Sequence, residues 1–168
     1  MNTNGLQPNT TSTTRESLDY HDSSFILTYN QLVARDFAAG ARYRLTRAAL
    51  EERFTDLTVV TAGPFNRNVN GWLHQVNLFA LYNHPSGIFG EFETIWSQQS
   101  NRGFTPNEPG DDFWQYNVYL GYRFLQRRGE VRIGLLNLSD RDYRLEPLTL
   151  YNELPRERTF AATLKLFF

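Results

Sequence analysis

The chain has 168 residues, the size of one domain, and a formal net charge of −1. This balance gives no electrostatic basis for nucleic-acid binding, so we expect no nucleic-acid partner. The absence of cysteine from the sequence excludes disulfide frameworks, zinc–cysteine sites and thiol nucleophiles. No apolar run reaches the roughly 18 residues that a transmembrane helix needs, but hydropathy does not test transmembrane strands, in which only alternate residues meet lipid.

The first segment, residues 1–22, is polar and rich in Asn, Thr and Ser, which predicts a loop or flexible arm. It lacks the basic stretch followed by apolar residues that marks a signal peptide. Residues 23–168 form the second predicted unit, a single β-barrel segment.

Seven segments of this unit alternate apolar and polar residues, as strands do. The connections between them alternate in length, from short ones such as ARDF and NHPSG to long ones such as QSNRGFTPNEPGD. This rhythm predicts an antiparallel meander with short turns at one rim and long loops at the other. The predicted strands are 23–34, 37–52, 70–83, 87–99, 112–126, 129–139 and 157–168.

Each predicted strand divides into an apolar face and a polar face. The apolar face includes Phe25 and Leu27, Val76 and Leu78, and Leu120, with Gln31, Arg47 and His74 as exceptions. In a soluble barrel the apolar face would be the core, whereas in an outer-membrane barrel it would face lipid and the polar face a wet lumen. The polar residues that the second alternative places in the lumen are Arg42, Arg44, Glu91, Glu93, Arg123, Arg132 and Lys165.

Three features favour the membrane alternative. Aromatic residues lie at both ends of the apolar face, as in the interfacial girdles of membrane proteins. The loops are long at one rim and short at the other, and the strands are longer than those of most soluble sheets. The fold class we predict is all-β, an antiparallel meander of about seven long strands in a partial transmembrane β-barrel, with a soluble lipocalin-like barrel as the alternative. The predicted girdle consists of Trp72, Trp96 and Trp114 near the long loops and of Tyr82, Tyr122 and Phe168 near the short turns.

The end of the chain resembles the carboxy-terminal end of TonB-dependent outer-membrane receptors. The segment GEVRIGLLNLSDRDYRL contains that family's "NL-x-D-x-x-Y" pattern at Asn137, Leu138, Asp140 and Tyr143, and the chain finishes as RTFAATLKLFF. The alternating residues Phe160, Ala162, Leu164, Leu166 and Phe168 resemble the signal read by the outer-membrane insertion machinery.

The resemblance implies an outer-membrane location and a role as the carboxy-terminal part of a receptor or transporter for ligand uptake, without chemistry of its own. It implies three partners: outer-membrane lipid, the barrel-assembly machinery and, through regions absent from this sequence, an energy-coupling inner-membrane complex. The family's plug and energy-coupling box have no counterpart here. Seven strands are an odd number, whereas single-chain bacterial outer-membrane barrels have an even number. We therefore expect a piece of a longer protein. The alternative is a small autonomous outer-membrane barrel with a structural or pore role.

Candidate catalytic and metal-binding residues form no convincing pattern. His21, His74 and His84 are scattered, and no Ser–His–acid set can be assembled on one face. Glu91 and Glu93, about 7 Å apart along one strand, are expected to pair with the lumenal arginines. We therefore predict no enzyme activity, no cofactor and no metal site. The loop SDRDYRLEPLTLYNELPRER is expected either to contact a substrate or to fold over the barrel mouth.

Overall fold

The computed structural model describes residues 14–56, 65–126 and 128–167. They form one antiparallel sheet of seven strands in sequence order, so the predicted meander is confirmed. None of these residues forms a helix long and apolar enough to cross a membrane. The strands are β1 (Glu16–Ala34), β2 (Phe37–Phe54), β3 (Arg67–Asn83), β4 (Ile88–Arg102), β5 (Asp112–Phe124), β6 (Gly129–Leu136) and β7 (Thr159–Leu166).

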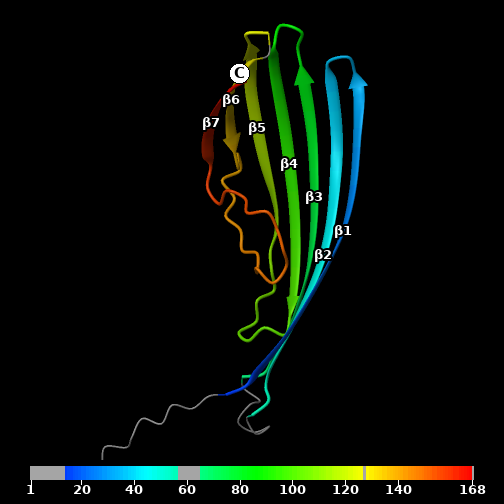
Figure 1. The fold of residues 1–168 in the computed structure, drawn as a ribbon, viewed down its shortest axis with the longest axis vertical. Coiled ribbons are helices and arrows are strands. Elements are labelled where there is room, and N and C mark those ends of the chain that lie inside the picture. The colour runs from blue at the N-terminus through cyan, green and yellow to red at the C-terminus, as the bar shows by residue number, and fades with distance from the viewer. Residues whose placement is uncertain (1–13, 57–64, 127, 168) are drawn as a thin grey trace, which may run out of the picture.

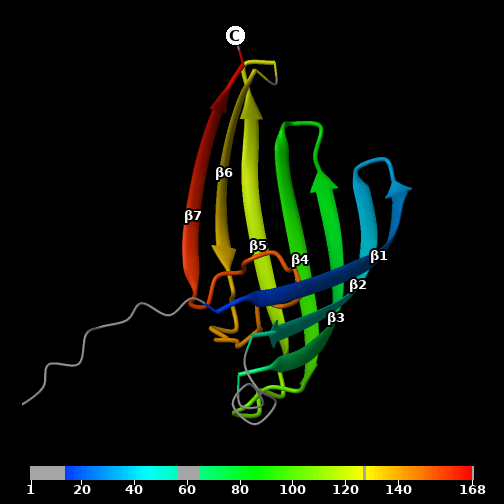
Figure 2. The ribbon, with the colours of Figure 1, turned by 60° about the horizontal axis from the view of Figure 1, so that its bottom comes forward.

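The sheet is open. Strands β1 and β7 lie at the two ends of the strand order, and the described residues of these two strands do not pair with each other. Figures 1 and 2 show a twisted, curved sheet in which β1 and β2 bend across the end where the long loops lie. The structure thus has the predicted all-β class, while its sheet does not close.

Two strands differ in length from the prediction. Strand β1 begins at Glu16, opposite Phe54 of β2, so residues 16–22 of the predicted arm belong to the sheet. Their polar side chains hid this extension, because ladder hydrogen bonds use the backbone whatever the side chains are. Strand β6 ends at Leu136, because Asn137 adopts the left-handed conformation, with φ of 50°, which interrupts an extended strand.

The two faces of the sheet differ sharply in what covers them. The apolar face is exposed over its whole width; Leu27 is 60% exposed, Leu120 57% and Phe160 66%. The opposite face includes Thr46, Ser97 and Gln115, all 0% exposed. The polar alternate residues are therefore the covered ones along the long-loop half of the sheet.

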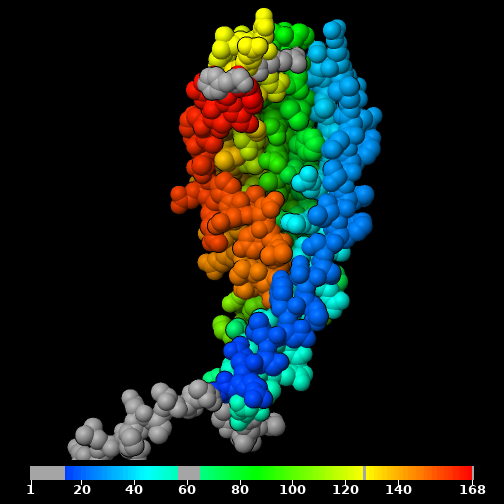
Figure 3. Space-filling view, viewed as in Figure 1, coloured from blue at the N-terminus to red at the C-terminus, as the bar shows by residue number. Residues whose placement is uncertain are grey.

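The cover is supplied by the connection between β6 and β7, residues 137–158, which we call the inner loop. It lies across the sheet from β6 and β7 toward β1 and β2 (Figures 1 and 3). The Tyr20 hydroxyl of β1 donates a hydrogen bond of 2.8 Å to the carbonyl of Leu148. Two small cores form beneath the loop, one of Leu73, Phe113, Tyr143 and Leu145 and one of Ala48, Val69 and Leu148. The loop thus packs on the polar face of the open sheet, and its predicted contact with a substrate stays a prediction.

Toward the short-turn end, the same face is filled by aromatic rings lying over glycines. The ring of Phe89 occupies the space that a side chain at Gly121 would need, and Tyr119 does the same at Gly134. Glycine permits this close approach because it has no Cβ. The result is a flat aromatic layer on which longer charged side chains can lie.

Candidate functional site

The seven polar residues predicted to share one face do so, on the side of the sheet that the inner loop covers. Arg132 of β6 donates to Glu91 of β4 at 2.8 Å, passing over the Tyr119 ring with its guanidinium 3.8 Å from the ring centroid. Arg123 of β5 pairs with Glu130 of β6 at 3.0 Å, and its guanidinium lies 4.2 Å from the Phe89 ring centroid. The aromatic layer therefore supports two ion pairs.

The predicted pairing of both glutamates with arginines is only half realised. Glu93 accepts hydrogen bonds from the side-chain amides of Asn77 at 2.6 Å and Asn117 at 2.9 Å. Arg42 and Arg44 form no ion pair with any carboxylate of the described residues. Alternation along each strand predicts the face of each residue, but which charges pair depends on side chains that reach past neighbouring strands.

The predicted aromatic residues lie on the opposite, exposed face. Trp96 and Trp114 are neighbours across β4 and β5, with ring centroids 6.2 Å apart, and the indole of Trp96 donates to Asp112 at 2.7 Å. Trp72, Tyr82 and Tyr122 lie on this face too, as do Phe160, Leu164 and Leu166 of the predicted insertion signal. Phe168, predicted for both sets, lies outside the described residues.

The polar exceptions on the exposed face each have an aromatic partner. The hydroxyl of Tyr43 lies 2.8 Å from Nδ1 of His74, and the guanidinium of Arg47 lies 5.1 Å from the Trp72 ring centroid. Gln31 accepts a hydrogen bond of 2.6 Å from Tyr29. These contacts satisfy part of the polar side chains' bonding capacity on a face that is otherwise apolar.

Asn137, the first residue of the pattern that carries the family resemblance, organises the inner loop. It is 0% exposed. Its side-chain amide donates to the carbonyls of Arg141 at 3.0 Å and Pro155 at 3.1 Å, and its Oδ1 accepts from the Arg141 N–H at 2.9 Å. Its own N–H donates to Oδ1 of Asn117 in β5 at 2.9 Å. One asparagine thus joins both ends of the loop to the sheet.

Asp140 and Tyr143 of the same pattern complete the loop's attachment. Asp140 accepts a hydrogen bond of 2.7 Å from the N–H of Arg158, just before β7. Tyr143 is buried with its ring stacked on Phe113, centroids 4.9 Å apart, and its hydroxyl donates to the Leu154 carbonyl at 2.9 Å. In this structure the pattern holds the loop in place. No sequence pattern indicated Gln99, whose side-chain amide holds the middle of the loop by donating to the Thr149 hydroxyl at 2.6 Å and to the Glu146 carbonyl at 2.8 Å.

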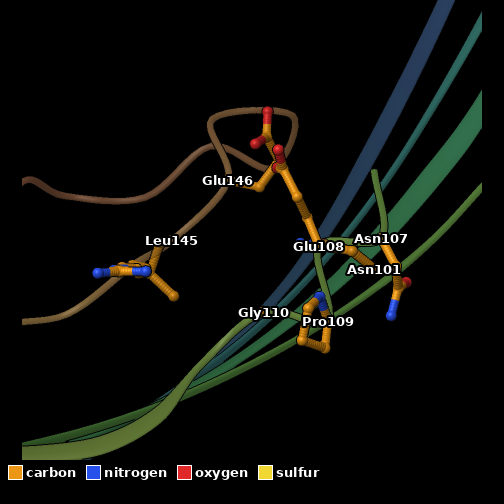
Figure 4. A pocket seen from close by; sticks show the side chains of 8 residues that line it. Asn101, Asn107, Glu108, Pro109, Gly110, Leu145 and Glu146 are labelled. Atoms are coloured by element: carbon orange, nitrogen blue, oxygen red, sulfur yellow. The ribbon is translucent and has the colours of Figure 1, made fainter. Parts of the chain in front are cut away.

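A cavity of about 440 Å³ separates the inner loop from the connection between β4 and β5. Glu146 of the inner loop and Glu108 of that connection point their carboxyl groups toward one another in it (Figure 4). Burial raises the pKa of Glu146, and the hydrogen bond and negative charge of Glu108 raise it further, against the opposing charge of Arg67. Folding therefore disfavours the ionised form of Glu146.

This pair predicts a pH-dependent inner loop. Because the pKa of Glu146 is raised in the folded state, a free-energy penalty for holding the ionised carboxylate destabilises the folded loop at pH above the raised value. It is relieved as the pH falls through that value toward the ordinary value of 4.5. We expect amide exchange of residues 144–149, corrected for intrinsic rates, to slow as the pH is lowered. Glu146→Gln should abolish most of this dependence; an unchanged dependence in that variant would show that another group is responsible.

The described residues contain no group of three or more His, Asp or Glu side chains placed to hold a metal ion. His21 meets Asp19 at 3.1 Å, and both side chains are largely exposed on β1. Comparison with models of known protein families, with curated proteins and with solved structures found no match for this chain. The candidate site is therefore the covered polar face itself, which offers charged and amide groups for binding.

Proposed function

We propose that this chain is the carboxy-terminal part of an outer-membrane β-barrel receptor or transporter for ligand uptake, similar to TonB-dependent receptors. The observation that carries the proposal is the exposure of the apolar face beside a polar face that the chain itself covers. Soluble monomers rarely expose apolar patches of more than a few hundred Å². A lipid bilayer is a solvent in which this distribution is favourable.

The apolar belt has the length that a bilayer requires. On the exposed face it runs over Phe25–Val33 in β1, Trp72–Tyr82 in β3 and Trp114–Phe124 in β5, which are nine, eleven and eleven residues. A tilted transmembrane strand needs about 9–11 residues. Beyond the belt, the same face of β1 continues with Ser23, His21 and Asp19. The long-loop ends of the strands would thus project into water.

The soluble lipocalin-like alternative requires the apolar face to be the interior. The inner loop packs instead on the polar face, through Tyr143 and Leu148. The described residues provide no cover for the apolar one. This arrangement favours the membrane proposal over the soluble one.

In the proposed mechanism a ligand passes along the polar face, and the inner loop narrows the passage near the outer rim. Energy would come from an inner-membrane complex acting through parts of the receptor beyond this sequence, and insertion would use the barrel-assembly machinery. The small autonomous barrel differs from this proposal in the size of the native species, which makes the test straightforward.

The test is the mass of the native protein in fractionated cells, detected on a denaturing gel with an antibody to residues 139–157. A band in the outer-membrane fraction several times larger than 19.6 kDa supports the receptor proposal. A membrane band of 19.6 kDa that migrates differently before and after boiling supports the autonomous barrel instead. Recovery in the soluble fraction overturns the membrane location altogether.

A further inference from the structure

A second cavity, of about 400 Å³, lies between strands β1 to β4 and the inner loop. Arg42 and Arg44 of β2 line it together with Gln75 and Asn77 of β3, and Leu154 of the inner loop closes one side. In Figure 3, atoms of β2 (cyan) are visible between the inner loop (orange) and β1 (blue). The cavity is therefore lined by two arginine side chains and can be reached from the surface of the molecule.

Neither arginine forms an ion pair with a carboxylate of the described residues. They are two positions apart on one strand, so they project to the same side about 7 Å apart along it. The glutamates of β4 and β6 on this face are already engaged, Glu91 by Arg132, Glu130 by Arg123 and Glu93 by two asparagines. The cavity thus has excess positive charge.

Two buried polar atoms at the cavity also lack a partner. Nε of Arg44 and Oδ1 of Asn77 are both shielded and make no hydrogen bond among the described residues. Buried polar groups are nearly always hydrogen-bonded, since an unpaired one costs about 1–3 kcal/mol. Ile26, Ile95 and Leu154 supply apolar walls. The cavity therefore offers charged donors, an amide and apolar surface together.

We propose that this cavity binds a small organic carboxylate, whose oxygens accept hydrogen bonds from Arg42 and Arg44 while its body contacts the apolar walls. Guanidinium groups match carboxylate geometry because they donate two parallel hydrogen bonds. As a step in uptake this inference rests on the proposed function and specifies its substrate class. Binding itself depends only on the cavity.

The test is calorimetric titration of the full chain, refolded in lipid nanodiscs, with succinate and with neutral succinamide as probes. We expect succinate to bind and succinamide to bind at least about tenfold more weakly. Arg44→Gln and Arg42→Gln should each weaken succinate binding by about tenfold or more. The matched control is Arg47→Gln, which removes the same charge from the same strand on the opposite face and should bind as the parent does.

Equal binding of the two probes, parent-like binding by both Arg42→Gln and Arg44→Gln, or an equal loss in Arg47→Gln would each overturn the proposal. Retained heat-modifiable migration identifies the variants that are folded, and only these are titrated. The result is separable from the proposed function. Succinate binding by a protein found outside the outer membrane would remove the transport role but keep the binding site. A protein found in the outer membrane that does not bind succinate would remove only the binding site.

Discussion

Replacing Leu78 or Leu120 by arginine should prevent stable insertion of the sheet into a bilayer. Both residues lie on the exposed apolar face, Leu78 40% and Leu120 57% exposed, and both lie well inside the belt. An arginine facing lipid near the bilayer midplane costs a transmembrane barrel about 2–4 kcal/mol. We expect Leu78→Arg and Leu120→Arg to lose most of the heat-modifiable form when refolded with phosphatidylcholine vesicles, and to unfold at lower urea concentration.

The matched control for these variants is Gln98→Arg. Gln98 is exposed on the same face of β4, two residues beyond Trp96, and pairs with Asp112 and His74 at the long-loop end of the belt, far from its middle. An arginine at the interface costs only about 0–1 kcal/mol, so this variant should insert normally. If Leu78→Arg and Leu120→Arg remained embedded as well as Gln98→Arg does, the apolar face would not be the lipid face.

Replacing Asn137 by alanine should release the inner loop. The change removes two donated and two accepted hydrogen bonds of the side chain beneath the loop, and it places alanine at a φ of 50°. Leaving buried groups unpaired costs about 1–3 kcal/mol each, and the left-handed backbone adds about 1 kcal/mol or more. A loss of roughly 3 kcal/mol would raise the open population about 100-fold. Trypsin cleavage at Arg141 and Arg144 should rise accordingly.

Two further variants separate the causes. Asn137→Gly adopts the left-handed conformation freely, so it should lose the hydrogen bonds but not incur the strain, and cleavage should be intermediate. Asn107→Ala changes an exposed asparagine on the neighbouring connection and should leave the cleavage rate unchanged. Cleavage of Asn137→Ala at the parent rate would mean that Asn137 does not hold the loop closed.

The number of strands, their order and the division into two faces could be predicted because each depends on local alternation. A residue such as Leu120 reveals its face through its immediate neighbours along the strand. The start of β1 at Glu16 could not be predicted in this way, since polar residues pair through the backbone as well as apolar ones do. The sheet is open among the described residues, so the predicted partial barrel stays a prediction.

The contacts within the candidate site were harder to predict because they join residues that are distant in sequence. Arg132 reaches Glu91 across an intervening strand, and Tyr143 stacks on Phe113, 30 positions earlier. Whether Arg42 has an ion-pair partner depends on which acidic residues of the face are already paired with other side chains. The pattern at Asn137 drew attention to a residue whose hydrogen bonds attach the inner loop to the sheet, a structural role that the sequence alone did not specify.

The contacts of the inner loop also bear on the order of folding. Among the described residues each strand pairs with its neighbours in sequence, so the sheet can grow hairpin by hairpin with short loop closures. Seating the loop tip, in contrast, joins Tyr20 to Leu148 across 128 positions, and distant contacts form late because their closure entropy is large. We expect the inner loop to dock last, onto a finished sheet. Substitutions within it should then change the rate at which it opens far more than the rate at which the strands assemble.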